Sequence, residues 1–183
     1  MATFEAIESI FIEAEVASVT FNNNLSGFRH LWLRADTSDG TFGGDDRKQL
    51  SVRFNGDSGT NYAYTRIQGT SGGIGATTSN TVHGWDCMGP NNDIGQSFGS
   101  SWTAFFNTAD SNVACAEMAY GGWGGSEANN NADDYSGRAI SSNSGSWWSN
   151  TAAVTSITVY VGSTPGDNFG RSSRFTLYGM KDS

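Results

Sequence analysis

The chain contains the stretch Phe28-Arg-His-Leu-Trp-Leu-Arg34, in which side chains of different character alternate along the sequence. In an extended chain, Phe28, His30, Trp32 and Arg34 lie on one face and the intervening residues lie on the other. A period of two residues is typical of a strand in an antiparallel sheet that has one face in the core. This stretch therefore indicates a β protein.

Similar segments recur along the chain and are bounded by Gly, Asn, Ser and Asp, which favour turns. They cover residues 7–12, 16–21, 50–54, 61–67, 97–107, 112–121, 156–161 and 173–178. Residues 70–80 are almost wholly Gly, Ser, Thr, Ala and Asn, so a mobile loop is expected there. No segment has a sustained helical period. The pattern predicts an all-β fold, an antiparallel β-sandwich, with a jelly roll as its topology.

Composition favours a single folded unit. The 183 residues include 24 Gly and only 2 Pro, and 37% of them are hydrophobic while 15% are charged. A disordered chain would combine low hydrophobicity with high charge. A chain of this length is also long enough to bury its own core. We expect one β-sandwich domain over residues 1–183, with residues 1–12 as a candidate extended N-terminal segment.

The charge limits the partners that the chain could bind. Its formal net charge is −8, which disfavours nucleic acid and anionic membranes because both carry phosphate. No run of apolar residues is long enough to predict a membrane span. Residues 1–10 lack the basic start and the apolar run of a secretion signal, so we expect synthesis in a cytoplasm. Cys87 and Cys115 are accordingly interpreted as reduced thiols.

Two acidic loops were considered as metal sites. Counting from Asn129, the sixth residue is Asp134 and the twelfth is Ile140, whereas an EF-hand needs Gly and Glu at those positions. The loop that begins at Asp36 also departs from the pattern. We interpret both as solvated turns, with a weak calcium site as the open alternative, and predict no cofactor and no metal ligand set.

Catalytic residues are scarce. The only histidines that could serve as a base are His30 and His83, and His30 is interpreted as a packed or hydrogen-bonded residue of a strand. Cys87 is a candidate nucleophile. Glu117 is the best candidate acid for glycoside hydrolysis, but no second acid stands out as its partner. The sequence therefore predicts a protein that is not an enzyme.

Tryptophan provides the candidate binding residues. Trp85, Trp123, Trp147 and Trp148 lie in or beside segments rich in Gly, Ser and Asn. Exposed rings of this kind can bind another protein or stack on a sugar. In an extended chain Trp147 and Trp148 point to opposite faces, so at least one of them is expected to pack inward. The four residues are candidates for an interface or a glycan-stacking site.

Several segments in combination resemble a group of tailed-bacteriophage virion proteins. They are residues 17–21, residues 28–34, the run Arg53-Phe-Asn-Gly-Asp-Ser-Gly-Thr-Asn-Tyr62, residues 153–159, and the ending Ser173-Arg-Phe-Thr-Leu-Tyr-Gly179. The resemblance covers the first 70 and the last 35 residues. It implies a minor structural protein of the virion, associated with the capsid or the tail, and it implies no catalytic residues.

We therefore expect a capsid decoration or cement protein that stabilises the shell through contacts with the major coat protein or other virion subunits. It would be located in the virion after assembly in the host cytoplasm. A homotrimer is expected by analogy with other jelly rolls on icosahedral shells. The alternative is a carbohydrate-binding module of a tail or baseplate that recognises a host glycan.

Overall fold

A computed structural model describes residues 3–38, 50–70, 73–82, 85–87, 99–109, 114–122, 139–150, 152–161 and 168–181. These residues form twelve β-strands and one short 3-10 helix, η1 (Leu25–Gly27). All of the strand pairings are antiparallel. The fold is all-β, as the alternating segments predict.

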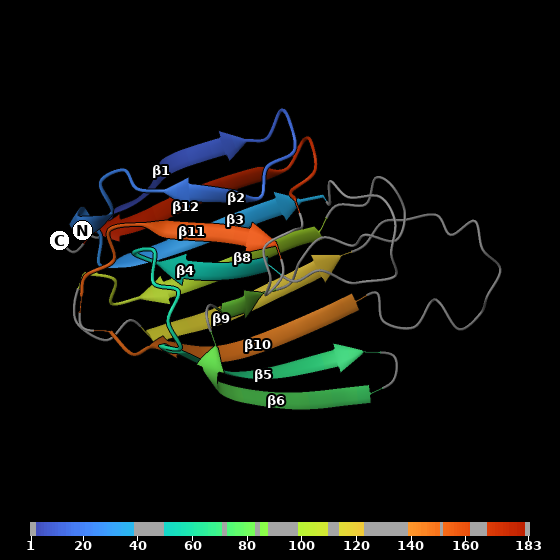
Figure 1. The fold of residues 1–183 in the computed structure, drawn as a ribbon. Helices are drawn as coiled ribbons and strands as arrows, with labels where there is room; N and C mark the ends of the chain where they lie inside the picture. The colour runs from blue at the N-terminus through green and yellow to red at the C-terminus, as the bar shows by residue number, and fades with distance from the viewer. Residues whose placement is uncertain are drawn as a thin grey trace.

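The strands form two sheets (Figure 1). The larger sheet has eight strands in the order β1 (Thr3–Phe11), β12 (Arg174–Lys181), β3 (His30–Thr37), β8 (Gly99–Phe106), β9 (Ala114–Gly122), β10 (Ala139–Trp148), β5 (Tyr62–Thr70) and β6 (Gly73–Val82). The smaller sheet has four, in the order β2 (Ser18–Phe21), β11 (Ile157–Val161), β4 (Leu50–Phe54) and β7 (Trp85–Cys87).

Eight of the strands pair in a nested order. The first strand, β1, pairs with the last, β12, and β2 pairs with β11. Further inward, β3 pairs with β8, and β4 pairs with β7. The β12–β3 and β11–β4 pairings then join these pairs into the two sheets. The other four strands, β9, β10, β5 and β6, extend the larger sheet beyond β8.

The core lies where the two sheets contact each other. In β3, Leu31, Leu33 and Ala35 are buried, so the predicted alternation is present from His30 onward and the face of the leucines is the inward one. From the smaller sheet, the ring of Phe54 packs edge-on against that of Phe105 in β8, with their centroids 5.3 Å apart. Burial of each such side chain stabilises the fold by about 1.5–3 kcal/mol.

The start of β3 differs from the prediction. Strand β3 begins at His30, and Phe28 follows helix η1. Phe28 is only 4% exposed, whereas His30 and Trp32 are partly exposed. The expectation that Phe28 shares a face with His30 and Trp32 is therefore wrong, because the strand alternation does not extend back to residue 28.

The expected loop at 70–80 is also wrong over most of its length. Residues 73–82 form β6, which pairs with β5 at the end of the sheet. An outermost strand needs backbone partners on one side only, so it can form without an alternating hydrophobic pattern. Thr65 and Thr78 illustrate the pairing, since their hydroxyl oxygens are 3.5 Å apart. Composition alone does not distinguish such a strand from a loop.

The N-terminal segment is extended and belongs to the larger sheet. Strand β1 pairs with β12 from Thr3 to Phe11, and the register shifts between Ala6 and Glu8. A shift of this kind is a β-bulge, which is common at sheet edges and discourages further pairing. Within the part of the chain described above, no helix is long and apolar enough to cross a membrane.

Candidate functional site

The tryptophans predicted from the sequence lie in strands or outside the described residues. Trp148 in β10 is 1% exposed, so its ring faces are covered by protein and offer no stacking surface. It is the inward-facing member of its pair. Trp85 lies in β7 and Trp147 in β10, not in loops, but nothing is described of their side chains. Trp123 lies outside the described residues.

Of the enzyme candidates, the structure describes the side chain of His30 alone. His30 accepts a hydrogen bond at Nδ1 from the backbone N–H of Asn107, at 3.2 Å, and is a hydrogen-bonded strand residue as expected. Cys87 and Cys115 lie in β7 and β9 and Glu117 lies in β9, with their side chains outside the description. Among the described residues, no group of three or more His, Cys, Asp and Glu side chains could hold a metal ion.

The run from Phe54 to Tyr62 forms a corner between the sheets. Asn55 and Gly56 have positive φ angles of 51° and 69°, and the N–H of Asp57 donates to the carbonyl of Phe54 at 2.8 Å. This is the geometry of a type I′ turn, which favours Asn-Gly. Asn55 Oδ1 accepts the N–H of Thr155 at 2.7 Å, which ties the corner to the segment before β11.

The partly exposed Asp57 and the buried Tyr62 hold the corner to the larger sheet. The Asp57 carboxylate accepts hydrogen bonds from Trp148 Nε1 at 2.7 Å, Asn61 Nδ2 at 2.9 Å and the Gly59 N–H at 2.9 Å. The Tyr62 hydroxyl accepts the N–H of Phe54 at 3.0 Å and donates to the Asp57 carbonyl at 3.1 Å. The Asp57 carboxylate and the Tyr62 hydroxyl are therefore used in hydrogen bonds that hold the corner in place.

The pKa values of these groups follow from their surroundings. Burial by itself would raise the pKa of Asp57, but hydrogen bonds, chiefly from Trp148 and Asn61, outweigh it and hold the pKa below the ordinary value of 3.8. Burial raises the pKa of Tyr62 far above its usual range. The tyrosine is thus a neutral hydrogen-bonding group and Asp57 is ionised at neutral pH.

Asp57 makes stability depend on pH in acid. Because the folded-state pKa is lowered, the unfolded chain takes up the proton at a higher pH, so the contribution of Asp57 is fully present above about pH 5. It is lost as the pH falls through the folded-state value. We expect urea unfolding to show a steeper loss of stability between about pH 4 and pH 2 for the natural chain than for Asp57→Asn. Equal slopes for both chains would contradict this role.

A different region has the character of a binding surface. The outward side of β1, β12, β3 and β8 carries a continuous group of aromatic rings. Two of them, Phe4 and Trp102, are 55% and 37% exposed and are large hydrophobic residues at the surface. We call the group the outer aromatic surface; it consists of Phe4, His30, Trp32, Trp102, Phe106 and Tyr178.

The rings of this surface stack across neighbouring strands. Tyr178 in β12 stacks with Phe4 in β1, with centroids 5.2 Å apart and planes at 8°. It also stacks with Trp102 in β8, at 5.8 Å and 21°. The guanidinium carbon of Arg34 lies 5.6 Å from the centroid of the Trp102 ring. Planar groups from four adjacent strands therefore form one packed layer on the sheet.

Trp32 closes the layer on the side of His30 and Phe106. Its plane is nearly perpendicular to that of Phe4 (74°, 5.3 Å) and that of Phe106 (84°, 6.2 Å). His30 packs edge-on against Phe106 with centroids 5.5 Å apart. Edge-to-face and offset-stacked pairs are the favourable arrangements of aromatic rings. The surface is thus preformed by its own contacts.

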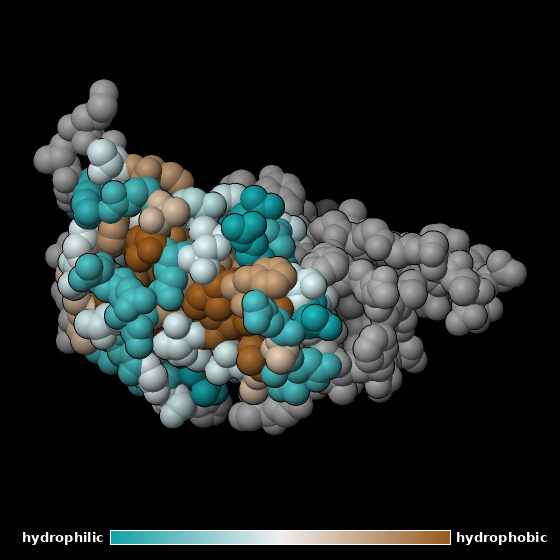
Figure 2. Space-filling view, turned by 90° about the horizontal axis from the view of Figure 1, so that it is seen from above, coloured by the Kyte–Doolittle hydropathy of each residue, from teal (hydrophilic) through white to brown (hydrophobic). Residues whose placement is uncertain are grey.

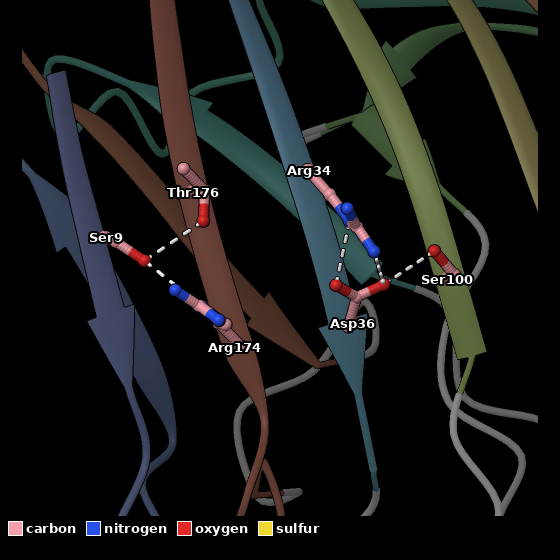
Figure 3. Close-up of polar contacts among 6 residues, drawn as sticks. All are labelled: Ser9, Arg34, Asp36, Ser100, Arg174 and Thr176. Carbon is pink, nitrogen blue, oxygen red and sulfur yellow. Dashed lines mark hydrogen bonds and ion pairs between the residues drawn. The ribbon is translucent and has the colours of Figure 1, made fainter. Parts of the chain in front are cut away.

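Polar side chains continue the same side of these strands (Figure 3). Arg34 Nε is 2.9 Å from an oxygen of Asp36, and the Ser100 hydroxyl donates to the other oxygen of that carboxylate at 2.6 Å. A second set joins β1 and β12, where Arg174 Nε donates to Ser9 Oγ at 3.3 Å and Ser9 Oγ is 3.0 Å from Thr176 Oγ1. These polar rows border the aromatic rings.

Contiguity distinguishes this group from ordinary exposed residues. The ring contacts establish this contiguity. Elsewhere, as in the view from above in Figure 2, hydrophobic residues appear as brown areas between polar ones. Isolated apolar residues at a surface are normal and need no explanation, whereas contiguous patches often mark interaction sites. The sequence pattern places Trp32, His30 and Arg34 on one face of a strand. The rings that pack against these residues come from distant segments, so the pattern could not identify them.

Comparison with known proteins adds no assignment. No protein-family model matches the chain, and no curated protein matches its sequence. The outer aromatic surface, with its exposed Phe4 and Trp102, is therefore the feature on which a proposed function can rest.

Proposed function

We propose that this chain is a structural protein of a tailed-bacteriophage virion, most specifically a capsid decoration or cement subunit that stabilises the shell through protein–protein contacts. The observation that carries the proposal is the outer aromatic surface, where Phe4 and Trp102 are exposed on a rigid sheet. Tryptophan, tyrosine and arginine are the residues most enriched among those that dominate binding energy at protein interfaces. The surface contains tryptophan and tyrosine, and Arg34 lies over its Trp102 ring.

The fold proposed with this function is a β-sandwich of jelly-roll topology. Support comes from the nested pairing of β1 with β12, β2 with β11, β3 with β8 and β4 with β7. A jelly roll arises when a long antiparallel pair of arms in that order rolls up into two four-stranded sheets. The contact of Phe54 with Phe105 and Trp148 between the sheets supports the sandwich.

The charge of the chain also suits a particle component. Its net charge of −8 would keep it from competing for packaged DNA. The proposed partners are the major coat protein or other virion subunits, including further copies of the chain. The hydrogen bonds of the Phe54–Tyr62 corner support a structural role for the run of residues in which the resemblance is clearest.

A glycan-binding module is the second candidate. Arg34, Asp36 and Ser100 place planar hydrogen-bonding groups beside the Trp102 ring, a combination that suits a sugar. It ranks second because sugar stacking needs an open ring face, and Tyr178 is already stacked with a ring from each neighbouring side. Glycan-array binding that Trp102→Ala abolishes would favour this candidate over the first.

The virion proposal is tested with phage particles that lack the chain. We expect such particles to release their DNA at a lower temperature than complete particles, because the cement contacts are missing. Complementation with the natural chain should restore the release temperature, whereas the double variant Phe4→Glu/Trp102→Glu should not. The matched control is Thr20→Glu, since Thr20 is an exposed residue of β2 in the smaller sheet and does not belong to the sheet that carries the outer aromatic surface.

Purified particles should contain the natural chain, as detected by mass spectrometry of their proteins. Unchanged release temperature and unchanged particle composition after deletion of the chain would remove the proposal. Restoration by the double variant to the level of the natural chain would contradict the assigned surface.

A further inference from the structure

We infer that the outer aromatic surface is the site at which copies of this chain bind one another. The inference rests on the proposed function in that it names the partner of the same surface. The partner that binds this surface is a second copy of the chain. Three observations support it: the packing of the rings, the distribution of charge, and the presence of both halves of a contact on one surface.

The packing of the rings favours a protein as the partner. Phe4, Tyr178 and Trp102 stack in series, so much of their face area is used within the surface. What remains exposed is an uneven layer with Phe4 at 55% and Trp102 at 37% exposure. A layer of this kind, held on four hydrogen-bonded strands, is suited to interdigitate with another side-chain surface, because little reordering is needed on binding.

Charge favours a second copy at this surface. Copies of a chain with net charge −8 repel one another, so they associate best where negative charge is low. In the polar rows beside the rings, the carboxylate of Asp36 is paired with Arg34 and Ser100. Arg174 adds a further positive charge, because its hydrogen bond is to the neutral Ser9 hydroxyl. The rows therefore lack the net negative charge of the whole chain.

The surface is also self-complementary in kind. A symmetric interface must contain both partners of every contact, because the same patch serves each subunit. Exposed rings and arginine side chains occur together here, and Arg34 already lies over Trp102 within one chain. Arginine stacks favourably on aromatic rings, and the pairing of one copy's arginine with another copy's ring uses only groups of this surface.

The test is the mass of the chain in solution. Light scattering during size-exclusion chromatography is expected to give the natural chain a mass that is a multiple of its 19.5 kDa. Phe4→Glu and Trp102→Glu should each raise the dissociation constant by at least about 30-fold and shift the mass towards one chain. Thr20→Glu, which adds the same charge at an exposed position of β2 in the smaller sheet, should leave the mass unchanged.

A second measurement does not depend on a disruptive variant. A photo-reactive benzoylphenylalanine at position 4 preserves an aromatic ring there and should cross-link two chains on illumination. The same group at Glu13, an exposed residue outside the strands, should give little cross-linking. Circular dichroism of every variant should show the β spectrum of the natural chain.

The possible outcomes separate this inference from the proposed function. A single-chain mass for the natural protein at all concentrations would overturn the inference, as would equal loss of association in Thr20→Glu. Cross-linking from position 4 only to coat protein, or a glycan that binds this surface without association, would also overturn it. If the chains associate through this surface but are absent from purified particles, the inference stands and the virion proposal fails.

Discussion

Replacement of Trp148 by alanine is expected to reduce the free energy of unfolding by about 3–5 kcal/mol, the cost typical of removing a large buried aromatic side chain. Trp148 is 1% exposed and packs against Phe54 and Tyr62, with ring centroids 5.4 Å and 6.3 Å away. Alanine would leave a cavity between the smaller sheet and β10. It would also remove the Nε1 donor from the Asp57 carboxylate. Urea unfolding followed by circular dichroism measures the change.

Two comparisons separate the packing of Trp148 from its hydrogen bond. Trp148→Phe keeps a ring in the core but leaves Asp57 without its 2.7 Å donor, so it should cost about 1–3 kcal/mol. Trp102→Ala removes a tryptophan that is 37% exposed and should cost less than Trp148→Ala. A loss below about 1 kcal/mol for Trp148→Ala would contradict its place in the core.

Gly179→Ala is expected to destabilise the fold by about 1–3 kcal/mol, which is the usual cost of overpacking a core. Gly179 lies in β12, and a Cβ atom added there would overlap the ring of Phe28. That ring is only 4% exposed and has little room to move. Gly179 is the last residue of the Phe-Thr-Leu-Tyr-Gly run. Its lack of a side chain leaves room for the ring of Phe28. Thermal unfolding and urea unfolding both measure the loss.

A double-variant cycle tests the cause. In a Phe28→Leu background the added methyl group meets a smaller side chain, so Gly179→Ala should cost less than it does in the natural chain. Gly27→Ala is the matched control, because a Cβ atom at Gly27 has nothing within 4 Å. Equal costs in both backgrounds, or a loss at Gly27 as large as that at Gly179, would show that the overlap with Phe28 is not the cause.

The strands that are predicted well are those that contribute buried apolar residues to the core. Residues 50–54 were predicted as a strand and form β4 with the same bounds, and residues 156–161 and 173–178 contain most of β11 and β12. In β11 and β12 the inward residues are apolar and buried, for example Ile157, Val159, Phe175 and Leu177. Apolar and polar residues alternate where one side of a strand faces the core, so this pattern identifies strands that border the core.

The strands that were missed do not show that pattern. Strand β6 consists largely of Gly, Ser, Thr and Ala at the end of the larger sheet, and β7 has only three residues. In β10, residues 139–148, the sequence is mostly Ser, Gly and Asn before its two tryptophans. Backbone pairing with β9 and β5 defines this strand, and backbone pairing does not require a particular amino-acid composition.

The candidate site shows the same limit. The face shared by His30, Trp32 and Arg34 was predicted correctly from their spacing in the sequence. The rings that complete the outer aromatic surface come from residues 4, 102, 106 and 178, and only the β1–β12–β3–β8 order brings them together. The sequence pattern instead favours tryptophans near glycine-rich segments, and of these Trp148 is buried. Strand order, which depends on long-range pairing, was the missing information.

The placement of β12 has a consequence for biosynthesis. Strand β12 lies between β1 and β3, yet the ribosome makes it after every other strand. Until it emerges, β1 lacks its only strand neighbour within the described residues and the β3 edge stays open to other chains. A nascent chain that stalls before residue 174 would therefore be unable to close the sheet. Synthesis of β12 therefore supplies the pairing that joins β1 to β3 in the larger sheet.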